Sequence, residues 1–496
     1  MAGITIGGLG SGLDTKAIIE ALVGVERVPI TALETKKTDE KKKLSLLTTL
    51  KGLVDSLQAK AKILSTTSQF LAFKVSAGDA TTASFKASGS AVAGSHAITV
   101  NQLASSDRWA FNGIVDPAAN LATADGQGVS FTYDGVAYNA PVTAAASTLN
   151  DIAAAINTAA PGKVSASVVN AGTATNPSYQ LVMAGQSTGE DLRISGISSS
   201  IAALTIDATG PTAGGVSQSV NNLTVGNNAI AVIDGLTIER ASNDFSDVLP
   251  GVSISVLTAD PLKSTTFTVE PDKDVIKGKL KDFVEAFNKV MTFIHDQNKY
   301  SEEDGAGGPL FGDNALRTIE KTIRKELFGT TAAQVGLDVA GFGTLKLLGM
   351  DLQKDGTLVI NDAKLSAKLD EDLNKFADLF ADTDGFDNGG ALVGTPGYYI
   401  DLSADSGLAD KLTRALDQAL KGYTDTNGKT SKGLFEARTD AINSRMKLFD
   451  RQIEDRQFRL ERFQAQLEQR FATLESVMAQ LQSQQSYLTN VTFGGS

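Results

Sequence analysis

Two glycine-rich segments of the chain contain residue types that bind phosphate in other proteins. GGLGSGLD spans residues 7–14, and GYTDTNGKT spans residues 422–430. In the first, no strand pattern precedes the glycines, and Leu13 stands where a dinucleotide-binding loop needs its third glycine. In the second, five residues separate Gly422 from Gly428, whereas a nucleotide-binding loop requires four. We therefore interpret the first as a chain tip before a helix cap and the second as a turn.

Acidic side chains gather in three loops, at residues 301–308, 382–390 and 425–436. A calcium loop needs oxygen ligands at alternate positions and a glutamate at the twelfth. Phe386 takes a ligand position in the second loop, and Lys429 takes one in the third, although Glu436 is twelfth there. These loops are better interpreted as solvated turns.

The chain has no cysteine and only two histidines, His96 and His295. Without cysteine there are no disulfides, thiolate zinc sites, iron–sulfur clusters or thiol nucleophiles. The two histidines fall on different predicted elements, and no Ser/His/Asp spacing supports a triad. We predict that the protein is not an enzyme and holds neither a cofactor nor a metal.

Charge and hydropathy exclude further classes of protein. Lys and Arg number 45 against 57 Asp and Glu, a net charge of −12, which disfavours nucleic-acid binding. No apolar run approaches the ~18–20 residues of a membrane span. The opening MAGITIGGLGSGLD lacks a basic region followed by an apolar core. It is therefore no conventional secretory signal, and export would need another route.

A seven-residue repeat dominates the C-terminal region, and no Pro or Gly interrupts residues 434–488. We predict one helix roughly 80 Å long with a coiled-coil stripe. The partner of that stripe, in the same chain or another, stays open. Every seventh residue is apolar: Met446, Ile453, Leu460, Leu467, Leu474, Leu481 and Leu488. The companion positions are mixed: Ile442, Phe449, Arg456, Phe463, Arg470, Val477 and Gln484.

The N-terminal region is also helical in pattern, over residues 13–65. Asp14 is a suitable N-cap, and a short apolar face follows. Pro29 is expected to interrupt this helix, and a second helix begins with the charged residues 34–43. The first face consists of Ile18, Ile19, Leu22 and Val23, and the second helix carries Leu46, Leu50, Leu53, Leu57 and Leu64.

The middle of the chain, residues 75–270, has the alternating pattern of antiparallel strands. Asp134-Gly135 and Asp234-Gly235 are typical of type I′ hairpin turns. One helix is expected at 147–159, and residues 185–229 are expected to be loops. The six predicted strand segments are 96–103, 129–139, 163–169, 179–185, 229–240 and 251–257.

Helical periodicity returns after residue 273. We expect helices at 274–298, after Asp313, over 365–380 and over 408–420, with a hairpin at 350–361. The order of helix, β insertion and helix brings the termini together. The predicted fold is α+β and multidomain, with terminal coiled-coil helices and a helical trunk that carries inserted antiparallel β domains.

Four segments, in order, resemble the bacterial flagellar filament-capping family, also called hook-associated protein 2. The opening GITIGGLGSGLDTKAIIEALVGVERVPITALETKK looks like the N-terminus of that family. The segments at 229–257 with 274–294 and at 345–380 are similar to its central motifs, and 471–488 to its C-terminus. A weaker similarity, at 129–185, is to a repeat shared by flagellins and their relatives.

This resemblance implies an extracellular structural protein at the tip of the flagellar filament. Members are exported unfolded by the flagellar apparatus without a cleaved signal peptide. They promote folding and insertion of flagellin and prevent its loss to the medium. The implied partners are flagellin, hook-associated junction proteins, an export chaperone and further copies of the chain in a ring of roughly four to six. The resemblance implies neither nucleic acid nor a membrane span.

The resemblance and the patterns together predict a division into legs, trunk and plate. The insertion is expected to hold two subdomains, 86–114 with 226–264, and 115–225. The predicted parts are an N-terminal leg at 1–44, a discontinuous trunk at 45–85 and 265–433, a β-rich plate at 86–264, and a C-terminal leg at 434–496.

Our hypothesis is that the C-terminal stripe, with Ile19 and Leu22, forms an assembly seam against flagellin or the hook-side junction. Polar companion positions suit contacts that are remade as each subunit is added. Adhesion is a further expected contribution of the exposed β domains. The alternatives are an adhesin that binds mucin or other glycans, and another axial component such as a hook–filament junction protein.

Overall fold

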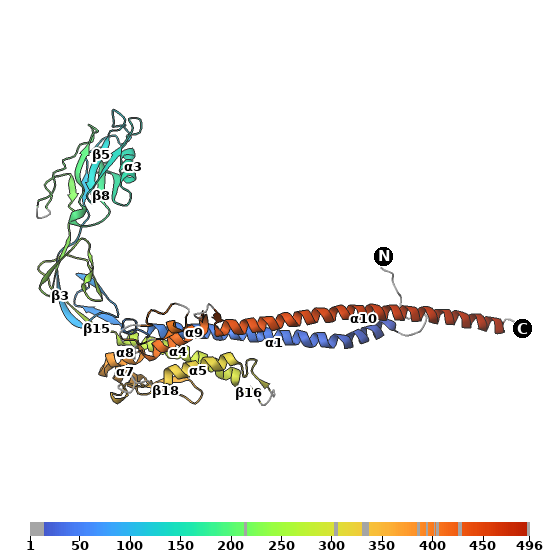
Figure 1. The fold of residues 1–496 in the computed structure, drawn as a ribbon. Coiled ribbons are helices and arrows are strands. Elements are labelled where there is room, and N and C mark those ends of the chain that lie inside the picture. The colour runs from blue at the N-terminus through green and yellow to red at the C-terminus, as the bar shows by residue number, and fades with distance from the viewer. Residues whose placement is uncertain are drawn as a thin grey trace. The chain divides into compact units, whose positions relative to one another are not determined.

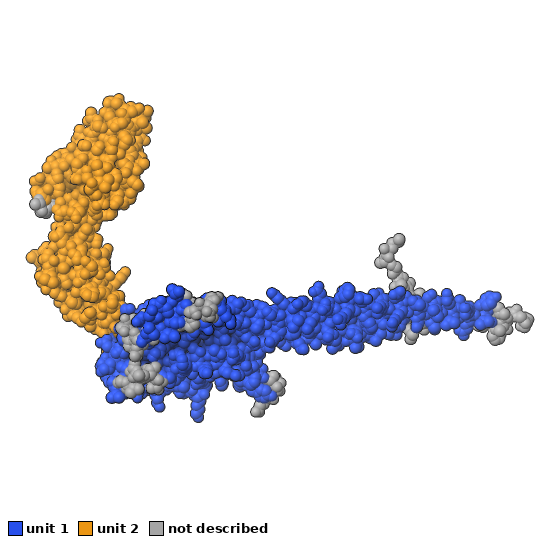
Figure 2. Space-filling view, viewed as in Figure 1, with its two compact units in different colours: residues 1–70, 277–496 blue, residues 71–276 orange. Residues whose placement is uncertain are grey.

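The computed structural model describes residues 14–212, 216–301, 306–329, 337–383, 387–392, 395–400, 402, 406–424 and 429–493. The fold is α+β, as predicted, and its chain forms two compact units (Figures 1 and 2). The first unit contains Met1–Phe70 and Lys277–Ser496, and the second contains Leu71–Ile276.

The first unit is mainly helical, and two long helices extend from its trunk (Figure 1). Among the described residues of this unit, short antiparallel hairpins lie between the helices: β16–β17, β18–β19 and β20–β21. The helices are α1 Thr15–Ile63, α2 Thr67–Phe70, α4 Lys273–Asn298, α5 Asn314–Phe328, α7 Asp362–Glu371, α8 Leu373–Phe380, α9 Leu408–Lys421 and α10 Leu434–Phe493, with a 3₁₀ turn at Pro396–Tyr399. The hairpin strands are Tyr300–Ser301, Ala306–Gly307, Met350–Leu352, Leu358–Ile360, Gly422–Thr424 and Thr430–Lys432.

The second half of α1 lies in the core of the trunk. Its fully buried stripe steps by three and four residues, and α4 and α5 bury stripes of the same kind. Phe70, Phe376 and Phe380 stack there with ring centroids 5.8–6.0 Å apart. Leu50, Leu57 and Leu64 of the expected stripe are buried, whereas Leu46 and Leu53 are only half-buried and Leu47 and Val54 are buried in their place. The buried residues of this part are Leu47, Leu50, Val54, Leu57, Ala61 and Leu64.

Two predicted helix boundaries are wrong. α1 runs through Pro29 without a break. Because proline has no N–H, the carbonyl of Val25 loses its helical hydrogen bond. Val25 is exposed, so water can bind that carbonyl instead. The helix expected over 365–380 is two helices, α7 and α8. Asp372 separates them with an extended backbone and caps α8 by accepting a hydrogen bond from the Lys375 amide.

The second unit consists of two lobes, each built on antiparallel sheets with its own core. The first lobe holds the sheets β1-β15-β3-β11-β12 and β13-β14-β2. The second lobe holds β10-β4-β8-β7 and β6-β5-β9 with helix α3. The first-lobe strands are Phe73–Ala77, Ala83–Ala87, Gly94–Gln102, Ala229–Ile233, Leu236–Arg240, Asp244–Leu249, Val252–Val256 and Thr265–Pro271 (β1–β3 and β11–β15). The second-lobe elements are Arg108–Ala110, Gly128–Tyr133, Val136–Pro141, Val164–Asn170, Tyr179–Gly185, Ser195–Ser199 and Asn222–Thr224 (β4–β10), α3 Leu149–Ala159 and a 3₁₀ turn at Glu190–Leu192.

Local sequence signals explain the turns and the helix of the second unit. Asp134 and Asp234 adopt φ of 53° and 51°, each followed by a glycine with positive φ, as type I′ turns require. Thr148 and Asp151 form a reciprocal capping box at the start of α3. The sheets of the first lobe also include β1, β2 and β15, which lie largely outside the predicted 86–264 insertion. The finer division into legs, trunk and plate stays a prediction.

Candidate assembly surface

The first half of α1 and most of α10 lie antiparallel, side by side (Figure 1). Three polar crossings define their register. The Thr15 hydroxyl donates to Glu475 Oε1 over 2.8 Å, Lys37 pairs with Asp450, and Arg445 pairs with Glu40 over 3.0 Å. From here on we call this pair, residues 15–44 of α1 with 445–475 of α10, the leg; its two helices lie within the predicted N-terminal and C-terminal legs. The N-cap is Asp14, whose carboxylate accepts from the Ala17 amide.

The nine predicted seam residues fall into two groups. Met446, Ile453 and Leu467 are half-buried in the leg, and Leu460 is only 9 % exposed. Leu474, Leu481 and Leu488 are exposed, the last two at 53 % and 62 %. Ile19 is half-buried near the start of α1, whereas Leu22 is exposed. The leg therefore brings the first half of the C-terminal stripe against α1 but not the second half.

The stripe leaves α1 because its seven-residue repeat does not match the helix. After Leu467 the half-buried positions of α10 are Phe471, Glu475 and Met478, in place of Arg470, Leu474 and Val477. A straight α-helix drifts by about 20° per heptad against a strict heptad stripe. From Met446 to Leu474, the last heptad position beside α1, the accumulated drift is about 80°, which turns the apolar stripe away from α1. Leu481 and Leu488 lie beyond Glu475, which is opposite the first residue of α1.

α10 continues past the start of α1, and we call residues 476–488 the tip (Figure 1). The tip contains no Asp, Glu, Lys or Arg, although the leg is rich in all four. Its apolar residues Val477, Leu481 and Leu488 are exposed. Depletion of charge together with exposed apolar side chains is one feature of the core of a protein–protein interface.

Ionic groups replace apolar packing in the middle of the leg. Glu40 is 5 % exposed, and its Oε1 accepts hydrogen bonds from Lys43 (2.9 Å) and Arg445 (3.0 Å). Burial opposes the charged form, but the hydrogen bonds from Lys43 and Arg445 outweigh it and hold the pKa of Glu40 below its ordinary value. Glu40 Oε2 is buried without a hydrogen-bond partner among the described residues. A seam of this kind is specific in register but weak.

Lys37 and Glu40 are not among the predicted seam residues, because they fall in the charged segment 34–43 that is expected to start a second helix. The signal was present: Ile30, Leu33, Leu44 and Leu47 step by three and four residues if positions 37 and 40 fill the gap. Continuing that phase would have placed both charged residues on the seam, opposite Asp450 and Arg445. Only the register of the pair, and no property of either helix alone, identifies these partners.

The leg is attached firmly to the trunk at its base. Arg438, in the first turns of α10, donates from Nε (2.9 Å) and from a terminal nitrogen (2.7 Å) to Asp313 Oδ2, while Asp313 also caps α5. On α1, the Gln58 side chain donates to Asp417 of α9 over 3.0 Å. The base therefore holds the two long helices in place while their far ends project.

The described part of the chain offers few side-chain groups suited to catalysis or metal binding. No cluster of three or more His, Asp or Glu that could hold a metal occurs there. His96 Nδ1 lies 2.7 Å from Asp234 Oδ2 at a hairpin turn, and His295 is exposed near the end of α4. Residues 7–13, 302–305, 384–386 and 425–428 of the glycine-rich and acidic loops lie outside the described residues. None of the helices described has the length and apolarity to cross a bilayer.

Two family models match this chain. The model for the flagellar hook-associated protein 2 C-terminus matches residues 226–483, more than half of the chain. The model for the flagellar hook-associated protein 2 N-terminus matches residues 11–107. Together they span the leg, most of the trunk and the first lobe.

Individual relatives agree with the family models. The A-type flagellar hook-associated protein 2 of Pseudomonas aeruginosa is 30% identical over 477 residues, which cover 91% of this chain and 89% of that protein. The flagellar hook-associated protein 2 of Escherichia coli K12 is 27% identical over 469 residues, covering 91% and 94%. The crystal structure of the D1–D3 domains of the Escherichia coli flagellar cap protein FliD superposes with a TM-score of 0.61 at 24% identity, covering 80% of this chain and 99% of that one. That likeness supports the fold.

Proposed function

The chain belongs to the flagellar hook-associated protein 2 family, and we propose that it caps the distal end of a bacterial flagellar filament. In this role it promotes folding and insertion of exported flagellin and prevents the loss of flagellin to the medium. The family is a structural one, and we propose no catalytic activity, cofactor or metal for this member.

One observation supports this function above the others: the uncharged tip of α10 with its exposed apolar stripe. Leu474, Leu481 and Leu488 continue the stripe whose first half packs on α1. Exposed apolar residues at heptad spacing are suited to a second helix. We propose that the tip binds helices of flagellin or of a neighbouring axial subunit.

The weak leg fits a contact that is released and remade. A cap must let each new subunit pass and then rebind, so a permanent apolar seam would resist its movement. The ionic crossings Lys37–Asp450 and Glu40–Arg445 give the leg a register at modest strength. We propose that Ile19 and Leu22, near the far end of the leg, belong to the same surface as the tip.

Partners beyond flagellin follow from the same role. We propose that several copies of the chain form a ring, that the ring first assembles on hook-associated junction proteins, and that an export chaperone binds the chain before secretion. We further propose an extracellular location at the filament tip, reached through the flagellar export apparatus. No observation favours adhesion or a junction role for this chain over the cap.

The test uses a strain that lacks this chain and is complemented with variants. The wild-type chain should restore filaments, and the deletion should release flagellin monomers into the medium. Leu481→Asp with Leu488→Asp should behave as the deletion does, because it places charges in the apolar stripe that we propose binds a partner helix. Both residues are exposed, so the substitutions should leave the fold intact. The measurements are soluble flagellin in the medium and filaments counted by electron microscopy.

A matched control puts the same two charges on another face of the tip. Ala479 and Ser486 are exposed and lie about 140–160° around the helix from Leu481. Ala479→Asp with Ser486→Asp should therefore keep filament growth. Normal filaments from the leucine variant would refute the role of the tip, and normal filaments from the deletion strain would refute the cap.

A further inference from the structure

Two passages of chain connect the lobes of the second unit. The chain leaves β3 for β4 through residues 103–107 and returns from β10 to β11 through residues 225–228. Ser105 and Asn227 tie the passages together, since each backbone amide donates to the other carbonyl, over 3.0 and 3.2 Å. Two passages side by side define an axis, and by themselves they leave rotation of one lobe about that axis unopposed.

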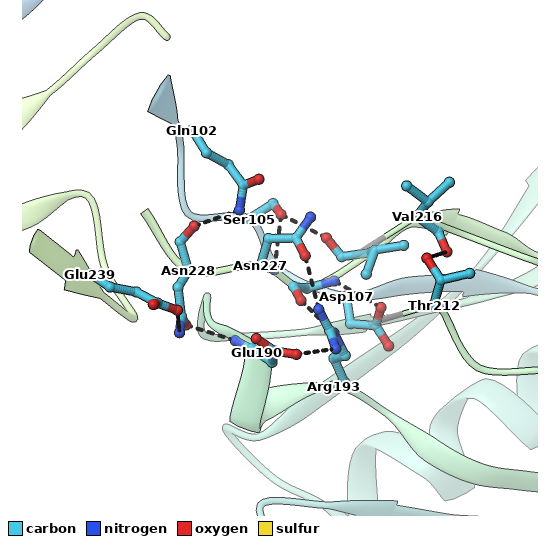
Figure 3. A network of polar contacts seen from close by, with 12 residues as sticks. Gln102, Ser105, Asp107, Glu190, Arg193, Thr212, Val216, Asn227, Asn228 and Glu239 are labelled. Atoms are coloured by element: carbon cyan, nitrogen blue, oxygen red, sulfur yellow. Dashed lines mark hydrogen bonds and ion pairs between the residues drawn. The ribbon is translucent and has the colours of Figure 1, made fainter. Parts of the chain in front are cut away.

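A third contact lies away from this axis. Residues 188–193 of the second lobe reach the returning passage at 226–228 and, beyond it, residues 239–241 of the first lobe. The Thr188 hydroxyl donates to the Ala241 carbonyl over 2.6 Å, and the Glu190 amide donates to Asn228 Oδ1 over 2.9 Å. Asn228 in turn donates to Glu239 Oε1 over 2.7 Å, so the chain of polar contacts runs from Glu190 to the edge strand β12 (Figure 3).

Arg193 completes this contact. Its Nε donates to the Gly226 carbonyl over 2.6 Å, one terminal nitrogen donates to Asn227 Oδ1 over 2.9 Å, and the other pairs with Glu190 over 2.7 Å (Figure 3). The rigid fork of a guanidinium suits three acceptors in a fixed arrangement. Arg193 therefore joins the 188–193 segment to the returning passage at the axis.

The backbones approach closely at Gly189. Its φ is +122°, and a Cβ placed there would lie 2.8 Å from the Cβ of Ala241. A side chain at this position would push residues 188–193 away from the first lobe. Glycine thus permits the contact that the hydrogen bonds then hold.

Asp107 sets the position of the segment from inside the second lobe. It is 1 % exposed, and its carboxylate accepts four hydrogen bonds from uncharged donors. Oδ2 accepts from Trp109 Nε1 (2.6 Å) and the Ile194 amide (2.8 Å), and Oδ1 accepts from Asn222 (3.1 Å) and the Gly226 amide (3.0 Å). One buried group therefore fixes both the end of the 188–193 segment and the returning passage.

We propose that residues 188–193 are a latch that holds the two lobes at one angle and opens without unfolding either lobe. Each lobe has its own apolar core, and the latch crosses between them through hydrogen bonds and the Gly189 approach. Hydrogen bonds to backbone and amide groups exchange with water at small net cost, so the latch is reversible. This inference does not depend on the proposed cap function.

The test measures the distance between the lobes in the full chain. The absence of cysteine lets spin labels be placed at Val136→Cys, on the exposed edge strand β6, and Leu236→Cys, on β12, with no background. Electron–electron double resonance should give one narrow distance distribution in this parent. Thr188→Ala with Arg193→Gln should raise the ratio of open to latched conformers by roughly five- to thirtyfold, which appears as broadening or a second distance.

A second variant and a control separate the latch from general damage. Gly189→Ala should open the latch by steric contact and give the same broadening. Arg240→Gln removes a guanidinium that pairs with Asp247 inside the first lobe and should leave the distribution narrow. A broad distribution in the parent, an unchanged one in both latch variants, or loss of folded circular dichroism in both would each overturn the proposal.

Discussion

The two halves of α1 show how differently one continuous helix can be stabilised. From residue 45 to its end, the helix buries a full apolar stripe and packs against α9 of the trunk. From residue 15 to 44 it buries only Thr15, Ile30 and Glu40. The trunk half is held by a fully buried apolar stripe, whereas the leg half has half-buried apolar contacts and polar crossings to α10. This difference in burial predicts that the base of the helix opens less readily than its far end.

The largest expected effect tests the packing of the trunk. Phe380→Ala removes a ring that stacks on Phe70 and Phe376, and it should cost about 3–5 kcal/mol of trunk stability. Calorimetry of the full chain should show the trunk transition at a lower temperature. Phe458→Ala makes the same change on the exposed surface of the leg and should stay within about 0.5 kcal/mol. Equal losses for the two variants would erase the contrast between the halves.

Hydrogen exchange along α1 should show the contrast directly. Amides near Leu50 and Leu57 need opening of the trunk before they exchange, whereas those at 20–28 need only local opening of the leg. We expect exchange in the leg to be about a hundredfold faster after correction for intrinsic rates. Uniform protection along the helix would mean that the leg is as stable as the trunk.

Pro29→Ala should narrow the difference between the halves. The substitution restores an amide donor for the Val25 carbonyl and removes the clash of the proline ring, for a local gain of roughly 1–3 kcal/mol. Protection of residues 20–35 should rise while protection near Leu57 stays the same. If protection of the leg did not change, Pro29 would not be the weak point of the helix.

The smallest expected effect concerns the ionic crossing at Glu40. Arg445→Ala should cost about 1 kcal/mol of leg stability, a value reduced because Arg445 is partly exposed. Arg451→Ala, on the exposed surface of the same helix, is the matched control and should cost less than about 0.5 kcal/mol. Thermal melting followed by the helical circular dichroism signal compares the two variants.

The same crossing has a pH dependence of known sign. The pKa of Glu40 is lower in the folded leg than in the unfolded chain. The carboxylate therefore stabilises the leg fully above its ordinary titration range, and this stability is lost as pH falls through the lowered folded pKa. The difference in melting temperature between wild type and Arg445→Ala should therefore shrink as the pH is lowered from about pH 7 to about pH 3. A difference that persisted at the acid end would contradict this assignment.

Elements defined by local periodicity could be predicted from the sequence. The stripe Ile276, Leu280, Phe283, Phe287 is buried in α4 as expected, and the strands around Asp134-Gly135 and Asp234-Gly235 pair as hairpins. These features depend on period and turn chemistry, which a sequence shows directly. The α+β class and its inserted strands followed from them.

Features that depend on how elements meet could not be predicted in this way. The break at Asp372 interrupts a stripe whose apolar spacing continues on both sides of it. The burial of Leu47 and Val54 in place of Leu46 and Leu53 depends on the packing partners of α1. The departure of the heptad stripe from α1 after Leu467 depends on how far the pair supercoils. The role of the seam residues in assembly therefore stays a prediction.

The uncharged tip has a consequence for the surroundings in which the protein works. Dissolved salt screens attraction between exposed charges, so the crossings Lys37–Asp450 and Glu40–Arg445 weaken as ionic strength rises. The contacts that we propose for Val477, Leu481 and Leu488 contain no such attraction to screen. A rise in the ionic strength of the medium therefore weakens the ionic crossings of the leg, whereas the proposed apolar contacts of the tip lose no electrostatic attraction.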